Sequence, residues 1–217
     1  MVQINGIVNE YIHVEKPDQE AVPSRQFDIS KIDFDLLSRE FAHTRRKNLL
    51  LRDLDELVNQ QLAKMLFANP QRIDYYDRYQ EIIDAYNAEQ NRATIEKTFM
   101  DLMELASSLD TEQQRYVREG FSSDEELSVY DLLFSENLTK QEIETIKKVS
   151  VDLLTKIKQQ IAKLDHWTDK QETKAIVDNL IRNTLWQELP NSYDVSDIQT
   201  YQKKIYEYVY MRYPEVA

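Results

Sequence analysis

The chain has 217 residues, of which 39 are acidic and 27 are basic, so its formal net charge at neutral pH is −12. This excess repels a nucleic-acid backbone at long range unless basic residues cluster locally. The absence of cysteine excludes disulfides and thiolate metal sites. Gly6 and Gly120 are its two glycines, whereas P-loops and dinucleotide-binding loops need several where the backbone approaches phosphate. Nucleotide sites of these kinds are therefore excluded.

Residues 1–28 differ in composition from the rest. Pro17 and Pro23 lie in a polar stretch that breaks helices and strands. We interpret the segment as a linker or the end of a preceding segment, and the chain as an excised fragment. No basic region followed by a long apolar run opens the sequence, and no apolar stretch approaches the length of a membrane span. We expect a cytoplasmic protein without membrane contact.

From residue 29 to residue 217 the pattern predicts one helical domain. Apolar residues recur at steps of three and four, whereas alternating runs and hairpin turn dipeptides are scarce. The fold class is therefore all-α: an array of about eight or nine helices with short connections.

The first helices are a short apolar one and a hairpin. The short helix carries Ile32, Phe34, Leu36, Leu37 and Phe41. In the next helix one face is apolar: Leu51, Leu54, Val58, Leu62 and Met65. Pro70 ends it at Asn69, because proline disfavours helical geometry at the preceding residue, and then opens the next helix. The short connection favours an antiparallel hairpin.

Four later pairs have the spacing of a capping box, which marks the first turn of a helix: Asp110 with Gln113, Ser123 with Glu126, Thr139 with Glu142, and Thr168 with Gln171. The longest later helix is predicted over 140–164, the next over 169–188, and the last from about Ser196. In the helix over 169–188 we expect Ile176, Leu180, Ile181 and Leu185 to face the core.

Classical catalytic and metal sites are not indicated. His13, His43 and His166 are far apart, and none has a second ligand at metal spacing. The acidic run 124–126 suits a first helical turn, where carboxylates interact favourably with the helix dipole, better than acid–base catalysis.

Two groups of residues are candidates for binding. For phosphate contact they are Arg45, Arg46, Lys47, Arg52, Lys140, Lys147 and Lys158; solvated faces and pairs within helices are the alternative explanation. For a protein partner they are the tyrosines of the last helix: Tyr201, Tyr206, Tyr208, Tyr210 and Tyr213. Interfaces favour tyrosine, but ordinary packing with hydroxyls at the solvent is the alternative explanation and explains these residues slightly better.

Short runs of the sequence resemble, in the same order, the carboxy-terminal region of the restriction (R) subunit of type I restriction-modification enzymes. These runs are RRKNLL (45–50), Asn69–Pro70, RIDYY (72–76), Tyr86–Asn87, RAT (92–94), YVREG (116–120), DEEL (124–127), YDLL (130–133), LDHW (164–167) and YEYVY (206–210). Each run is short, and their collinear order makes the resemblance specific. It extends from about Ile29 to Tyr213.

The resemblance implies a place in a larger motor subunit, which has a nuclease domain, two helicase-type ATPase domains and a helical carboxy-terminal region. In that family the last region is linked to docking on the methyltransferase core of M and S subunits. ATP and Mg²⁺ belong to the upstream domains, so this fragment is expected to have no cofactor and no catalytic residue. We expect a non-catalytic assembly domain whose partners are the M and S subunits and the upstream domains. The rival hypothesis is a module that guides DNA through phosphate contacts.

Overall fold

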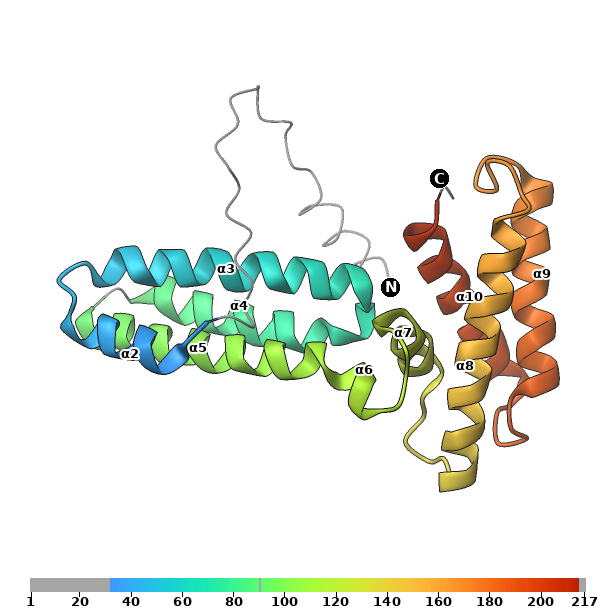
Figure 1. Cartoon of the computed structure of the whole chain (residues 1–217), viewed down its shortest axis with the longest axis horizontal. Helices are drawn as coiled ribbons and strands as arrows, with labels where there is room; N and C mark the ends of the chain where they lie inside the picture. The colour runs from blue at the N-terminus through green and yellow to red at the C-terminus, as the bar shows by residue number, and fades with distance from the viewer. Residues whose placement is uncertain (1–31, 90, 215–217) are drawn as a thin grey trace. The chain divides into compact units, whose positions relative to one another are not determined.

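The computed structural model describes residues 32–89 and 91–214 (Figure 1). Over these ranges the chain forms nine α-helices and one short 3-10 helix, without strands. The predicted all-α fold is confirmed. The described residues divide into two compact units, one ending at Arg115 and the other beginning at Tyr116. The predicted linker over 1–28 lies outside the described residues.

The first unit is built around a long helix that packs against two others. Its elements are α2 (Phe34–His43), α3 (Lys47–Ala68), the 3-10 helix η2 (Pro70–Arg72), α4 (Ile73–Ala88) and α5 (Arg92–Gln113). Helix α5 packs along both α3 and α4. The ring of Phe41 in α2 stacks on that of Phe99 in α5, with 3.6 Å between their centroids. The apolar stripes predicted for these helices therefore meet in one core.

The break between α3 and α4 lies at Asn69 and Pro70, as predicted. The Asn69 amide donates to the Met65 carbonyl at 2.8 Å and closes α3. Its side chain accepts from the Gln71 amide at 3.1 Å, and Pro70 fits the first position of η2 because it has no amide proton to satisfy. Asn69 thus caps the end of α3 and the start of η2. Helix α4 then runs back in the opposite direction to α3 (Figure 1).

A buried ion pair joins the start of α4 to the end of α5. Arg72 Nε donates to Glu112 Oε1 at 3.0 Å, and the two side chains are 3% and 10% exposed. Arg115 Nη1 donates to the same carboxylate oxygen at 3.1 Å. Burial raises the pKa of the nearby Tyr75, as does the negative charge of Glu112. This network fixes the register between the two helices.

The second unit contains the short helix α6 (Arg115–Arg118), which spans the boundary, and four longer helices. These are α7 (Asp124–Leu133), α8 (Lys140–Ile161), α9 (Gln171–Glu188) and α10 (Val195–Arg212). Helix α8 packs against α7 and α9, and α10 packs against α9 and α7. The four helices enclose a core that includes the fully buried Leu133, Ile146, Leu153, Ile157, Ile181, Leu185 and Ile205.

Two of the four predicted capping boxes mark helix starts, and two predictions were wrong. Ser123 caps α7, and Thr139 forms a complete capping box with Glu142 at the start of α8. Asp110 instead lies inside α5, because burial of Leu109 and Glu112 carries that helix past it. The Thr168 hydroxyl donates to the Pro214 carbonyl at 3.2 Å and caps no helix.

Two apolar residues of the predicted helices are exposed. Leu36 of α2 is 52% exposed, and Ile176 of α9 is 42% exposed. In α9 the neighbouring Val177 is fully buried in place of Ile176. One residue of helix corresponds to a rotation of about 100°, so a small error in the assigned phase exchanges a buried for an exposed residue.

Candidate functional site

The five C-terminal tyrosines do not share one environment. Tyr208 is buried in the core of the second unit, and burial raises its pKa to about 12. Tyr201 is half-buried, and its ring packs edge-on against that of Tyr193 at 5.5 Å. Tyr210 is 39% exposed. Burial also raises the pKa of Tyr201, so the hydroxyls of Tyr201 and Tyr208 stay protonated at neutral pH and supply neither a base nor an anionic nucleophile.

Trp167 organises the other tyrosines at one end of the unit. It lies in the turn between α8 and α9, is 1% exposed, and donates its indole proton to the Tyr213 carbonyl at 2.5 Å. Its ring lies edge-on to Tyr206 at 6.2 Å and to Tyr210 at 5.7 Å. His166 precedes it with a positive φ of 46°, which turns the chain so that the indole points inward. Tyr206, Tyr210 and Tyr213 therefore mainly contribute to the packing around Trp167.

Three of the predicted phosphate contacts are held in intramolecular ion pairs. Lys47 donates to Glu96 at 2.6 Å, and its ammonium lies 4.9 Å from the Phe41 ring centre. Lys158 of α8 pairs with Glu125 of α7. Lys147 of α8 pairs with Glu119 at 3.2 Å. These ion pairs connect neighbouring segments of the fold, so packing within the protein accounts for the presence of these lysines.

The remaining four basic candidates are exposed. Arg45 and Arg46 lie in the connection between α2 and α3, where Arg46 provides no side-chain cap. Arg52 is 72% exposed, and its guanidinium lies 3.7 Å from the Asp53 carboxylate. Lys140 is exposed in the first turn of α8. Arg45, Arg46 and Arg52 belong to the first unit and Lys140 to the second, so the four residues do not form one patch within either unit.

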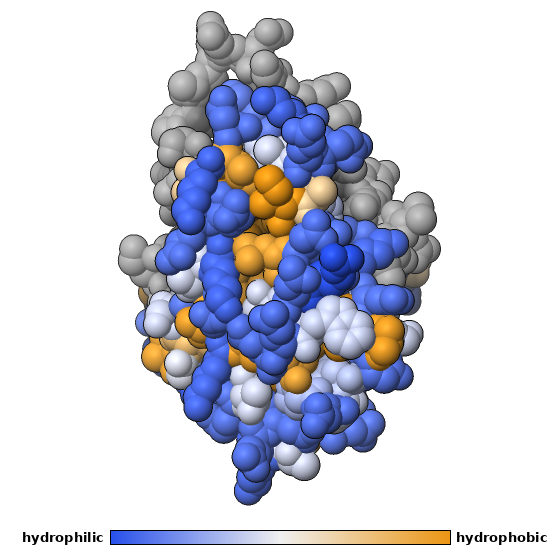
Figure 2. All heavy atoms as spheres, turned by 90° about the vertical axis from the view of Figure 1, so that its right-hand side faces the viewer, coloured by the Kyte–Doolittle hydropathy of each residue, from blue (hydrophilic) through white to orange (hydrophobic). Residues whose placement is uncertain are grey.

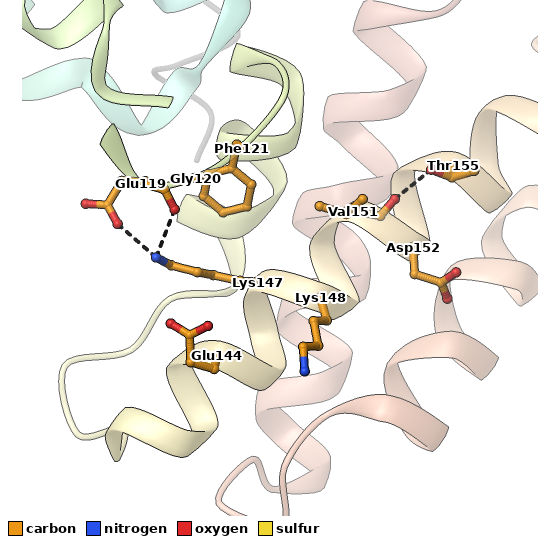
Figure 3. Close-up of a pocket in the computed structure, with 9 residues that line it drawn as sticks. All are labelled: Glu119, Gly120, Phe121, Glu144, Lys147, Lys148, Val151, Asp152 and Thr155. Atoms are coloured by element: carbon orange, nitrogen blue, oxygen red, sulfur yellow. Dashed lines mark hydrogen bonds and ion pairs between the residues drawn. The ribbon is translucent and has the colours of Figure 1, made fainter. Parts of the chain in front are cut away.

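An open hollow of about 580 Å³ lies against α8 in the second unit (Figure 3). Its lining includes Lys147, Lys148, Glu144 and Asp152. Lys147 Nζ donates to the Glu119 carboxylate at 3.2 Å and to the Glu119 carbonyl at 3.0 Å, so its charge is already matched. The hollow carries mixed charge, and its lining provides no arrangement of base and nucleophile.

Glu125, which lies in the acidic run 124–126, has a structural role. Burial alone raises the pKa of its carboxyl group, but the hydrogen bond from Lys158 and the charges of Lys158 and Arg212 outweigh that effect and lower the pKa. Arg212 of α10 lies 3.6 Å from the same carboxylate. Glu125 therefore ties α7 to α8 and α10, a role that the sequence pattern did not indicate.

Within the described residues no cluster of three or more potential metal ligands occurs. No helix there is long and apolar enough to cross a membrane. His43 Nδ1 lies 2.8 Å from the Arg39 carbonyl oxygen, and His166 Nε2 lies 3.6 Å from Asp165. Each is a local surface contact, and His13 lies outside the described residues.

The described residues form an all-helical fold in which several ion pairs, such as those of Glu112 and Glu125, join one helix to another. Residues 17–213 match the family of C-terminal domains of type I restriction enzyme HindI endonuclease subunit-like proteins. The chain belongs to this family, which confirms the resemblance to the R subunit. No curated protein and no solved structure matches the chain.

Proposed function

We propose that this domain is a non-catalytic assembly module of a type I restriction enzyme. It docks the ATP-dependent translocase and endonuclease subunit on the methyltransferase core of M and S subunits in the cytoplasm. The observation that carries the proposal is the family match over 17–213 to the C-terminal domain of such an endonuclease subunit. The resemblance found in the sequence adds the link between this region and docking.

The contacts inside the domain support a role without chemistry of its own. Carboxylates that could act in catalysis are used in packing: Glu112 bonds Arg72, and Glu125 bonds Lys158. In the hollow against α8, Lys147 is paired with Glu119. The chain's two glycines also provide no loop for nucleotide phosphates. We propose that ATP and Mg²⁺ act in other domains of the subunit.

The test is binding of the purified chain to the methyltransferase core, and separately to a bare DNA duplex, at low and high salt. Docking predicts binding to the core that persists as salt rises, because an interface with an apolar centre depends little on counterions. Failure to bind the core at any salt concentration contradicts the proposal.

A DNA-guiding role is the second candidate, and the exposure of Arg45, Arg46, Arg52 and Lys140 favours it. Phosphate contacts release counterions, so duplex binding through these residues weakens steeply as salt rises. Duplex binding of this kind, lost on changing Arg45 and Arg46 to glutamate and accompanied by no binding to the core, would replace the docking proposal. The overall charge of −12 opposes it.

A further inference from the structure

A second, smaller cavity lies in the second unit, where the connection between α7 and α8 meets the start of α10. At the end of the chain that is lowest in Figures 1 and 2, where α8 begins and α9 leads into α10, hydrophilic side chains and side chains of intermediate hydropathy cover most of the surface. The volume of the cavity is about 290 Å³. Sites for drug-sized ligands span about 300–1,000 Å³, so this one suits a single small group. Its polar lining consists of Ser135, Asn137, Ser192, Tyr193, Asp197 and Tyr201.

Two tyrosine rings form a fixed, uncharged wall of this cavity. Tyr193 is buried, and its hydroxyl donates to the Leu133 carbonyl at 2.7 Å. The ring of Tyr201 lies edge-on to it, and burial raises the pKa of both hydroxyls. The face of an aromatic ring attracts cations. The ammonium of Lys204 already lies 5.6 Å from the centre of the Tyr201 ring, so this wall accepts an ammonium group.

The carboxylate in the lining has no basic partner among the described residues. Asp197 Oδ2 accepts from the Asp194 amide at 3.1 Å, whereas its Oδ1 accepts no hydrogen bond from the part of the chain that the structure describes. The charges of Glu142 and Asp197 both raise the pKa of Tyr193 further, after burial. By contrast, three other carboxylates of this unit each pair with a lysine of α8: Glu119, Glu125 and Glu188. The cavity is therefore left with a negative charge that a bound cation would balance.

The other groups around Asp197 suit an organic cation. An ammonium group has three donors and no acceptor. The side chains of Ser135 and Asn137 make no hydrogen bond to another described residue, so their oxygens can accept. Leu138 adds apolar surface for a short alkyl chain. The negative charge disfavours an anion, and a divalent metal needs more ligands than the one carboxylate in this lining.

We propose that this cavity binds a primary ammonium group on a short alkyl chain. The Asp197 carboxylate is its counter-ion, and the rings of Tyr193 and Tyr201 are the wall against which it lies. The ligand class is an alkyl amine, either free or as the lysine side chain of another polypeptide. The site does not depend on the docking role proposed above.

The experiment titrates the whole chain, labelled with nitrogen-15, with butylammonium chloride at constant ionic strength and follows the amide shifts by NMR. The amides of residues 135–138 and 192–201 should shift and saturate with a dissociation constant on the order of 1–10 mM, as for so small a ligand. Butanol is the matched neutral probe. It should bind about 10-fold more weakly or worse, because it lacks the charge that Asp197 balances.

One variant and one control test the role of the carboxylate. Asp197→Asn keeps an oxygen that can accept from the Asp194 amide but removes the charge, so it should weaken butylammonium binding about 10-fold or more. The matched control is Asp165→Asn, since the Asp165 side chain is 93% exposed in the turn between α8 and α9, outside this cavity. It should bind butylammonium like the unchanged chain.

The comparison of the two probes on the unchanged chain decides the matter even where Asp197→Asn fails to fold. Equal binding of butanol and butylammonium shows that charge plays no part and overturns the inference. A butylammonium titration without saturable shifts at these amides overturns it too, as does unchanged binding by Asp197→Asn with the helical circular dichroism of the parent. Given selective binding, a lysine blocked at both backbone ends identifies the source. Comparable binding of this probe supports a site for a polypeptide side chain, and its failure to bind supports a site for a free amine.

Discussion

The ion pair between Arg72 and Glu112 provides the sharpest test of how the first unit is held together. Replacing Glu112 with leucine keeps the volume similar but leaves Arg72, 3% exposed, without its carboxylate. Removing one partner of a buried pair costs about 3–5 kcal/mol, because the remaining desolvated charge loses the carboxylate that faces it. A domain's total stability is about 5–15 kcal/mol. The change is therefore a large fraction of what holds the unit folded.

Arg78 and Glu104 provide a matched control, because they join the same two helices. Their atoms are 3.1 Å apart, nearly as close as those of the buried pair, but the side chains are 43% and 72% exposed. Such an exposed pair contributes about 1 kcal/mol or less. Glu104→Leu should therefore change stability little, and the comparison isolates the effect of burial from that of distance.

Urea unfolding followed by far-ultraviolet circular dichroism is the appropriate assay. Both tryptophans, Trp167 and Trp186, lie in the second unit, so their fluorescence does not report the first unit directly. With a dependence on urea of about 1.5–2 kcal/mol per molar, a loss of about 4 kcal/mol lowers the midpoint by about 2–2.7 M. Equal midpoints for Glu112→Leu and Glu104→Leu would refute the reasoning. The double variant Arg72→Met, Glu112→Leu should recover most of the loss, since it removes both charges.

Three further predictions concern the second unit. Thr139→Ala removes the N-cap of α8 and should lower stability by about 0.5–2 kcal/mol in the same urea assay; an unchanged midpoint would mean that the capping box contributes nothing. The pKa of Glu125 is lowered in the folded state, so its stabilising effect is complete above the ordinary value of 4.5 and is lost as pH falls below it. Thermal melts from pH 6 to pH 3 should therefore decline more steeply for the parent than for Glu125→Gln, and parallel curves would contradict this. Acrylamide should quench fluorescence strongly in Trp167→Phe, where the exposed Trp186 emits, and weakly in Trp186→Phe, where the buried Trp167 emits; the reverse order would contradict the assigned burial.

Local signals in the sequence predict the helices well, because their physical causes are local. Asn69 followed by Pro70 ends a helix whatever surrounds it, since the restriction lies in the proline ring and the residue before it. The Thr139 and Glu142 box closes within one helical turn. Asp110 has the same spacing to Gln113, yet α5 continues past it because Leu109 and Glu112 are buried against other helices. Tertiary packing overrides a local signal there.

The parts that sequence reasoning missed depend on pairs far apart in the chain. Arg72 and Glu112 are forty residues apart, and Glu125 meets Lys158 thirty-three residues later. Nothing in the spacing of charges along one helix identifies such partners. The same holds for lysines 47, 147 and 158, which the sequence offers as candidates for phosphate contact. Each carboxylate that pairs with them comes from a distant segment, so the sequence pattern does not reveal it.

The choice of candidate surface shows why helix phase matters more than composition. Five tyrosines near the C-terminus attract attention by number, but Tyr206, Tyr208 and Tyr210 are two residues apart and so point in different directions around α10. Tyr208 enters the core, and Tyr206 and Tyr210 pack against Trp167. Trp186 is a single aromatic residue, but its place in α9 is opposite the buried face, where packing inside the unit cannot use it. A side chain that its own unit leaves exposed, as Trp186 is at 50%, is therefore better evidence for a partner than a cluster that the fold has already used.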